Sequence, residues 1–93
     1  MKFVTTYQIH HDARDKAGSR FLETQAPALS GVTLLGRWHA AAGPLGFLLL
    51  EGDDAAAIYR FAAEWHDVCD LSVTPVIEDE AAEAVLSSRR SHS

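Results

Sequence analysis

The chain has 93 residues, of which 47% are hydrophobic and 23% are charged. These proportions are typical of a globular protein and exclude a disordered or membrane-embedded chain. A formal net charge of −5, without a lysine or arginine cluster in the body of the chain, argues against nucleic acid as a partner, because phosphate-backbone binding needs a positive surface. The longest apolar run, residues 45–50, is far shorter than the roughly 20 residues that a membrane helix requires, so no membrane contact is expected.

The N-terminus and the single cysteine bear on the location of the protein. Residues 1–7 alternate apolar and polar types and lack the apolar core and small-residue cleavage site of a secretion signal. Cys69 is the one cysteine, so it forms no internal disulfide, which fits a reducing compartment. We therefore expect a cytoplasmic protein.

The chain begins with a predicted strand and helix. Residues 2–9 are rich in β-branched and aromatic types, which is typical of a strand. Asp12 then resembles a helix N-cap, and apolar residues recur at helical spacing before Pro27. Gly18 lies inside this helix, where we interpret it as a point of close packing against a sheet.

A hairpin follows. Residues 32–40 and 45–51 read as two strands, and Gly43-Pro44 between them has the chemistry of a turn. Residues 47–50 are apolar on both faces of the second of these strands. This pattern favours a central strand that is covered above and below.

The second half of the chain predicts a helix, an edge strand and a short helix. Asp53 or Asp54 caps a helix whose apolar residues follow the i, i+3, i+4, i+7 rule of one buried stripe, namely Ile58, Phe61, Ala62 and Trp65. Residues 71–77 alternate as a strand, and Pro75 places that strand at an edge because it lacks the N–H that a central strand needs. The acids at 78–80 precede a short helix over 81–86, and we expect residues 87–93 to be a flexible tail.

Together these elements predict an α+β fold with a ferredoxin-like βαββαβ(α) plan. Residues 1–86 form one domain, with a four-stranded antiparallel sheet and the helices on one of its faces. The other face would expose Leu35, Leu49 and similar side chains unless something covers it. A second copy is the simplest cover, so we expect a homodimer in which two sheets pair face to face.

Strand alternation divides the candidate functional residues between the two sheet faces. Arg37 and His39 share one face of their strand, and Leu34 lies on the other. If Leu34 meets the helices, Arg37 and His39 point into the space between the two sheets of the dimer, where Thr6 and Gln8 of the first strand join them. A shift of the strand register by one residue would exchange the residues of the two sheet faces.

Each of these residues has a functional and a structural interpretation. In the first, His39 is a general acid/base, because an ordinary imidazole titrates nearest to neutral pH, and Arg37 holds an anionic or enolate-like oxygen. In the second, the two residues satisfy an acid such as Glu51 or a neighbouring carbonyl. Tyr7 and Trp38 form an aromatic wall for a planar ligand, or they belong to the core, as aromatic residues on half-buried strands most often do. Both interpretations stay open.

The run from Trp65 to Asp70 brings together side chains that are able to bind a metal, namely His66, Asp67 and Cys69. However, Trp65 belongs to the buried stripe of the second helix, His66 is placed to cap that helix, and no second cluster supplies further ligands. Cys69 has neither a base nor a second thiol near it in the sequence. We therefore expect no metal and no cofactor.

Three segments resemble a known family. They are MKFVTTY at residues 1–7, LLGRWH at 34–39, and TPV at 74–76 followed by acids up to residue 80. They resemble a bacterial domain-of-unknown-function family of the dimeric α/β-barrel superfamily, over nearly the whole chain. The resemblance singles out Gly36, Arg37, Trp38, His39 and Trp65, whereas Tyr7 stands where a tryptophan is expected.

The resemblance implies a range of functions, because relatives in that superfamily include cofactor-free monooxygenases, muconolactone isomerase-like enzymes, polyketide cyclases, haem-dependent enzymes and ligand-sensing domains. We expect a cofactor-independent enzyme of the isomerase, cyclase or monooxygenase type that acts on a small aromatic or polyketide-like molecule. One alternative is a non-catalytic homodimer that binds a ligand or a partner. Another is haem binding through His39 or His66. The expected catalytic residues are His39 and Arg37, and the expected ligand-binding residues are Thr6, Gln8, Tyr7, Trp38 and Trp65.

Overall fold

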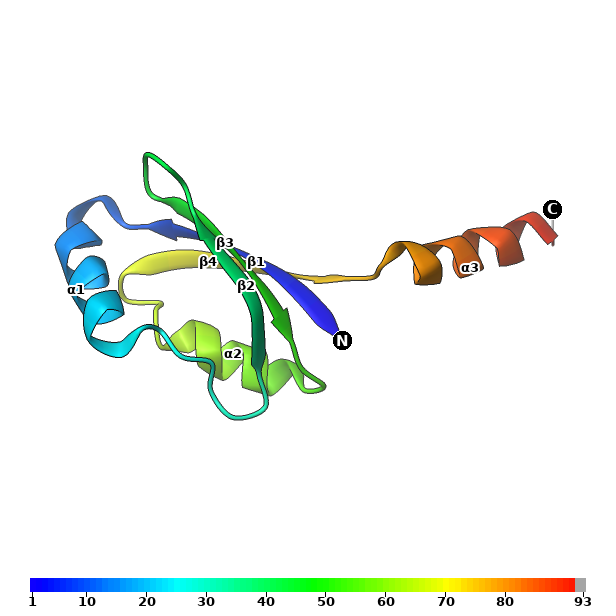
Figure 1. Ribbon diagram of the computed structural model, residues 1–93, viewed down its shortest axis with the longest axis horizontal. Coiled ribbons are helices and arrows are strands. Elements are labelled where there is room, and N and C mark those ends of the chain that lie inside the picture. Colours follow the sequence, from blue (N-terminus) through cyan, green and yellow to red (C-terminus); the bar gives the residue numbers. More distant parts are fainter. Residues whose placement is uncertain (92–93) are drawn as a thin grey trace.

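The chain forms a four-stranded antiparallel sheet with two helices on one face and a third helix beyond the sheet, in a computed structural model that describes residues 1–91 (Figure 1). The strand order is β2-β3-β1-β4. This α+β, ferredoxin-like arrangement confirms the predicted fold class. In chain order the elements are β1 (Lys2–Ile9), the 3₁₀ turn η1 (His11–Ala13), α1 (Arg14–Thr24), β2 (Thr33–His39), β3 (Leu45–Glu51), α2 (Ala55–Ala63), β4 (Cys69–Val76) and α3 (Asp79–Ser91).

The positions of the strands in the sheet follow their composition. The apolar strand β3 pairs with β1 on one side and β2 on the other, which confirms that it lies inside the sheet. Strand β4 pairs with β1 alone and lies at an edge, where the missing N–H of Pro75 is tolerated. Both predictions from the sequence are confirmed, although β4 begins at Cys69, two residues before the predicted start.

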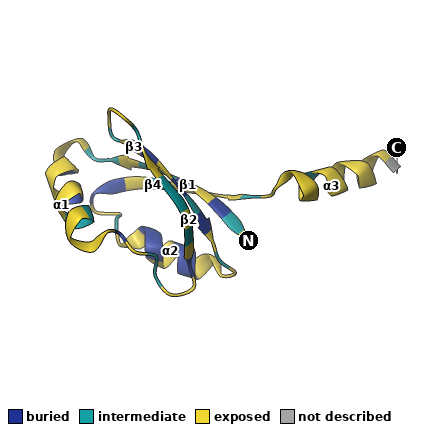
Figure 2. Cartoon of the chain, viewed as in Figure 1, coloured by how far each residue is buried: buried dark blue, intermediate teal, exposed yellow. Residues whose placement is uncertain are grey.

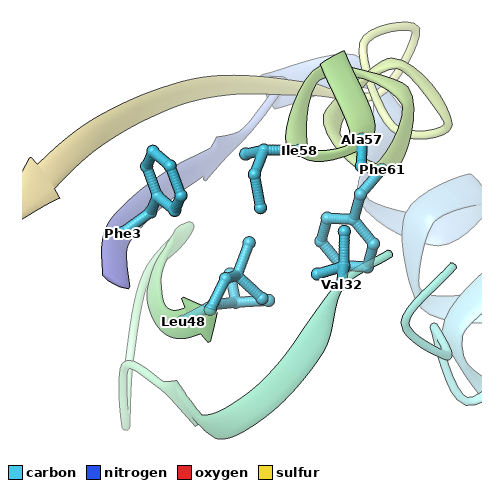
Figure 3. Packing of buried hydrophobic residues seen from close by; sticks show 7 residues of the cluster. Phe3, Val32, Leu48, Ala57, Ile58 and Phe61 are labelled. Atoms are coloured by element: carbon cyan, nitrogen blue, oxygen red, sulfur yellow. The ribbon is translucent and has the colours of Figure 1, made fainter. Parts of the chain in front are cut away.

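The main core lies between the sheet and α2. Figure 3 shows Phe3 and Leu48 from the sheet meeting Ile58 and Phe61 from the helix, and all four are at most 5% exposed. Burying side chains of this size stabilises the fold by about 1.5–3 kcal/mol each. Asp54 caps α2 as predicted, because its carboxylate accepts a hydrogen bond of 2.9 Å from the backbone N–H of Ala56. A second cluster joins α1 to the start of β4 through Ala13, Ala17, Val68 and Cys69.

The first helix differs from its prediction in two details. Asp12 lies within η1, and no side chain caps α1, which begins at Arg14. Gly18 is not a point of close packing, because a Cβ atom built there meets nothing within 4 Å. Gly18 is exposed, and it also lines the pocket described below.

Helix α3 is longer than predicted and points away from the sheet (Figure 1). The sequence predicted a helix over 81–86 and a flexible tail over 87–93, whereas α3 continues through Ser91. Residues 92–93 of that tail lie outside the described part of the chain. Figure 2 shows α3 as almost entirely exposed. Within residues 1–91, no helix is both long enough and apolar enough to cross a membrane.

A β-bulge in β2 decides which residues face the helices. Leu34 pairs with Leu50 of β3, but the next pair is Gly36 with Leu49, so Leu35 is an extra residue in β2. An extra residue reverses the alternation of side chains beyond it. As a result Leu34 faces the helices, and so do Arg37 and His39 further along the strand. The expected position of Arg37 and His39 on the opposite face from Leu34 is therefore wrong.

Candidate functional site

A pocket of about 180 Å³ lies between the sheet and the helices α1 and α2. Most of its lining is apolar, and its polar groups are the phenol of Tyr7, the imidazole of His39, the guanidinium of Arg37 and the thiol of Cys69. Such a cavity, apolar with a few convergent polar groups, is typical of a small-molecule site. The remaining lining residues are Ile9, Ala17, Gly18, Phe21, Ala26, Leu48, Phe61, Trp65 and Leu71.

Tyr7 and His39 are hydrogen-bonded to each other across the central strand. Gly46 of β3 pairs with Tyr7 on one side and with His39 on the other, so the three residues form one row of the sheet. The tyrosine side chain lies over Gly46 and brings its hydroxyl to 2.6 Å from Nδ1 of His39. A Cβ atom at position 46 would lie 2.0 Å from the tyrosine ring, so only glycine permits this contact.

The state of Tyr7 determines the direction of this hydrogen bond. Burial raises the pKa of the Tyr7 phenol, nearby Cys69 adds to the increase, and Arg37 partly opposes it. The phenol therefore keeps its proton at neutral pH, so that its O–H is able to donate a hydrogen bond to Nδ1 of a neutral His39. A neutral imidazole that accepts at Nδ1 carries its own proton on Nε2. In this arrangement the single N–H of His39, at Nε2, is left unused as a donor.

Phe21 of α1 packs against both of the predicted catalytic residues. Its ring meets the imidazole of His39 edge-on, with 5.3 Å between the ring centroids. The guanidinium carbon of Arg37 lies 4.9 Å from the same ring centroid, in a cation–π arrangement. Phe21 therefore forms an apolar wall of the pocket between its two basic groups.

Arg37 holds the turn that follows α1. Its Nη1 donates to the carbonyl of Ala26 at 2.9 Å, and its Nη2 donates to the carbonyl of Gln25 at 3.1 Å. Both residues have left-handed backbone conformations, with φ of 61° at Gln25 and 41° at Ala26. Arg37 thus has the structural role of satisfying neighbouring carbonyls, which stabilises a turn that residues other than glycine seldom adopt.

The far end of the pocket is formed by Trp65 and Cys69. Burial raises the pKa of the Cys69 thiol, which keeps it protonated and unreactive. Trp65 contacts Arg20 of α1, whose guanidinium carbon lies 5.3 Å from the ring centroid. Arg20 in turn donates two hydrogen bonds of 2.8 and 2.7 Å to Asp67. This chain of contacts attaches α1 to the segment after α2 and closes the pocket on that side.

The run from Trp65 to Asp70 has structural contacts of its own. Asp67 is bound by Arg20 and Lys16, which hold the pKa of its carboxyl well below the usual range. The ring of His66 packs edge-on against Tyr59 of α2. Among residues 1–91, no three histidine, cysteine or carboxylate side chains lie close enough together to hold a metal ion.

The structure brings together four of the seven predicted site residues. Tyr7, Arg37, His39 and Trp65 line the pocket on the helix-facing side of the sheet. The other three, Thr6, Gln8 and Trp38, lie on the outer face. They are separated from the first group because β1 alternates regularly, whereas β2 changes face at its bulge.

Sequence reasoning missed Phe21, Gly46 and Gly18 as parts of the site. Phe21 appeared in the sequence only as one member of an apolar helix stripe. A glycine inside a predicted strand is a known signal for a bulge or a close approach, and Gly36 and Gly46 both carry that signal. Attention to these two glycines would have pointed to the bulge and to the packing of Tyr7.

Comparison with known proteins gives a family and a similar fold. A family model described as a domain of unknown function (DUF3303) matches residues 1–90. This match confirms the resemblance to a domain-of-unknown-function family that the sequence predicted. One similar solved structure is SCO4226 from Streptomyces coelicolor A3(2), with 18% sequence identity and a TM-score of 0.46 over 84% of this chain and 100% of that one. No curated protein matches the chain in sequence.

Proposed function

This chain belongs to the DUF3303 family, and from the geometry of its pocket we propose that it binds a small, planar, mainly apolar molecule between its sheet and its helices. The observation that carries the proposal is the Tyr7–His39 hydrogen bond of 2.6 Å in a cavity whose other walls are chiefly apolar. The apolar walls favour a ring, and the free N–H of His39 favours one oxygen acceptor on that ring.

The size of the pocket suits a ligand of one or two rings. Its volume of about 180 Å³ is slightly above the ~150 Å³ cavity that is known to accept benzene. It is well below the roughly 300–1,000 Å³ of sites for drug-sized ligands. Haem does not fit this pocket, because the cavity is too small. Haem is therefore not proposed as the ligand of this pocket.

Acid–base catalysis is a second candidate, and the Tyr7–His39 pair favours it. A base that is itself oriented by a third group is the usual arrangement for proton transfer. In this mechanism Nε2 of His39 exchanges a proton with the bound molecule while Tyr7 holds the imidazole in place. Arg37 is a positioning residue, because it supports the turn that carries Ala26 into the pocket wall. This candidate retains the expected cofactor-independent isomerase, cyclase or monooxygenase chemistry.

We also propose that the protein is a homodimer whose outer sheet faces are covered by the second copy. The outer face exposes large apolar side chains, among them Trp38 at 57% and Phe47 at 46%. Contiguous apolar patches of this kind on a soluble protein usually mark an interaction surface. Homodimers of twofold symmetry cover such a patch with the same patch of a partner.

The binding proposal is tested by filling the pocket from α1. Ala17 lines the pocket and is 4% exposed, so Ala17→Leu places a larger side chain at the buried wall of the pocket. Phenol is the probe, and backbone amide resonances are followed by NMR, which also checks that each variant folds. We expect phenol to shift the resonances of Phe21 and His39 saturably in the wild type and in the Gly18→Ala control, whose new Cβ meets nothing within 4 Å, but not in Ala17→Leu. No shift in the wild type, or an equal shift in a folded Ala17→Leu variant, would overturn the proposal.

Catalysis is separated from binding with a variant of the base. Once a substrate is identified, His39→Gln is expected to lower kcat by about 10²–10⁴-fold, which is the usual contribution of a general acid or base. The same variant should still bind phenol, because Phe21 and the apolar walls remain. An unchanged kcat would eliminate the catalytic role of His39 and leave the protein as a binding domain.

A further inference from the structure

The outer face of the sheet carries a continuous apolar strip. In β3, Leu45, Phe47 and Leu49 point outward at every second residue, and Val4 of β1 and Trp38 of β2 flank them. These five residues define the outer strip. Four of them are large exposed hydrophobic side chains, and Leu49 is partly buried. The β4 half of the same face is polar, with Ser72 and Thr74 in register with β1.

Helix α3 carries a second exposed apolar surface. Ala81, Ala82, Val85 and Leu86 follow helical spacing on one side of α3 and define its apolar stripe. Val85 and Leu86 are 57% and 59% exposed. The helix points away from the sheet and gives the molecule its long axis of 54 Å, against 29 and 18 Å (Figure 1). The radius of gyration of 16.2 Å exceeds the roughly 12 Å expected for a compact chain of this length.

A helix in this position needs a partner. It has 13 residues, and isolated helices shorter than about 12–15 residues are marginal in water. Most helical stability in proteins comes from packing an amphipathic face against another element. The chain therefore has two uncovered apolar surfaces of matching character, one on a sheet and one on a helix.

We propose that α3 of each copy lies on the outer strip of a second copy, so that a twofold pair exchanges its C-terminal helices. This inference rests on the proposed homodimer and names the contact that forms it. A direct pairing of sheets would cover the outer strip but leave α3 in solvent. The exchange covers both surfaces with a single contact, which the twofold axis repeats.

The dimensions of the two surfaces agree. Helix α3 is about 20 Å long, and β3 with its seven residues spans about 23 Å. On a scale of roughly 150–250 Å² for a large side chain, the exposed fractions of the six most exposed members amount to about 450–750 Å² per chain; these members are Val4, Trp38, Leu45, Phe47, Val85 and Leu86. That range approaches the ~800 Å² that each partner contributes to a standard stable interface.

The connection to α3 favours a second copy over the same chain. Only Ile77 and Glu78 separate β4 from α3. Glu78 forms an ion pair with Lys2 at the start of β1, and its carbonyl accepts a hydrogen bond of 3.1 Å from the N–H of Ala82. These contacts direct α3 outward from the sheet edge. The helix therefore points away from the outer strip of its own chain.

The test places charges in the α3 stripe of the full chain. Val85→Glu/Leu86→Glu should raise the dimer dissociation constant by at least about 100-fold, because the symmetry buries each new charge twice. Leu22→Glu is the matched control, since Leu22 is a 74% exposed apolar residue on α1, away from both surfaces. It should leave the dissociation constant unchanged. Sedimentation equilibrium gives the constants, and circular dichroism checks that each variant folds.

A second measurement identifies the contact itself. A mixture of ¹³C-labelled and unlabelled chains, studied by isotope-filtered NOESY, should show Leu86 methyl protons of one copy close to ring protons of Trp38 or Phe47 in the other. A wild-type monomer would overturn both this inference and the homodimer. A charged variant that stays dimeric while Phe47→Glu dissociates would overturn the exchange and support direct sheet pairing. Contacts found only within one chain would show that α3 folds back, which also overturns it.

Discussion

Replacement of Gly46 by alanine tests whether the Tyr7–His39 contact depends on a missing side chain. The new Cβ would lie 2.0–2.2 Å from three atoms of the Tyr7 side chain, whereas atoms in ordinary contact are separated by about 3.5–4.0 Å. The Tyr7 ring must therefore move by roughly 1 Å or more. This movement breaks the hydrogen bond between Tyr7 and His39. Loss of that bond costs about 1 kcal/mol, and overpacking at a buried site costs about 1–3 kcal/mol.

Part of this cost is offset, since alanine is better than glycine in a strand by about 0.5–1 kcal/mol. The net expectation is a destabilisation of roughly 1.5–3 kcal/mol, or a decrease in Tm on the order of 10 °C for a domain of this size. Urea unfolding measures the free energy and calorimetry measures Tm. Gly18→Ala is the control, because its Cβ meets nothing and it should stabilise α1 by up to about 1 kcal/mol.

A double-mutant cycle with Tyr7 isolates the cause. In a Tyr7→Phe background the ring still meets the Cβ of residue 46, so most of the cost of Gly46→Ala should remain. In a Tyr7→Ala background the clash is gone, and Gly46→Ala should be neutral or slightly stabilising. An equal cost of Gly46→Ala in the wild-type and Tyr7→Ala backgrounds would refute the reasoning, because it would place the strain elsewhere.

Three further predictions concern stability. Thr5 is fully buried, and its hydroxyl has no hydrogen-bond partner among the described residues. Thr5→Val should therefore stabilise the protein by about 1 kcal/mol in urea unfolding, and a destabilised variant would contradict this. Arg37→Lys replaces a guanidinium that donates two hydrogen bonds by a single point charge. It should lower the free energy of unfolding by about 1–2 kcal/mol and speed hydrogen exchange over residues 25–32. Unchanged exchange over these residues would contradict the role of Arg37. The pKa of Asp67 is lowered in the folded state, so its ion pairs stabilise the protein above the unfolded pKa of about 3.9 and this contribution disappears as the pH falls. Asp67→Asn should therefore be less stable than wild type at pH 7, and the difference should narrow towards pH 3.

The sequence determined the elements and their order because those depend on local properties. Apolar residues on both faces placed β3 inside the sheet, Pro75 placed β4 at an edge, and Asp54 began α2, each through a rule that involves a few neighbouring residues. The resemblance in residues 34–39 also directed attention to Arg37 and His39, which do line the pocket.

Only the tertiary structure decided which face of the sheet these residues occupy. Leu35 becomes an extra residue because β2 pairs with β3 in a register that shifts between Leu34 and Gly36, and that register depends on both strands at once. The shift turns Arg37 and His39 toward the helices, where Tyr7 reaches His39 across Gly46. The residue types along one strand do not determine how that strand pairs with its neighbour. The sequence therefore identified the polar groups of the site, whereas the fold brought them together.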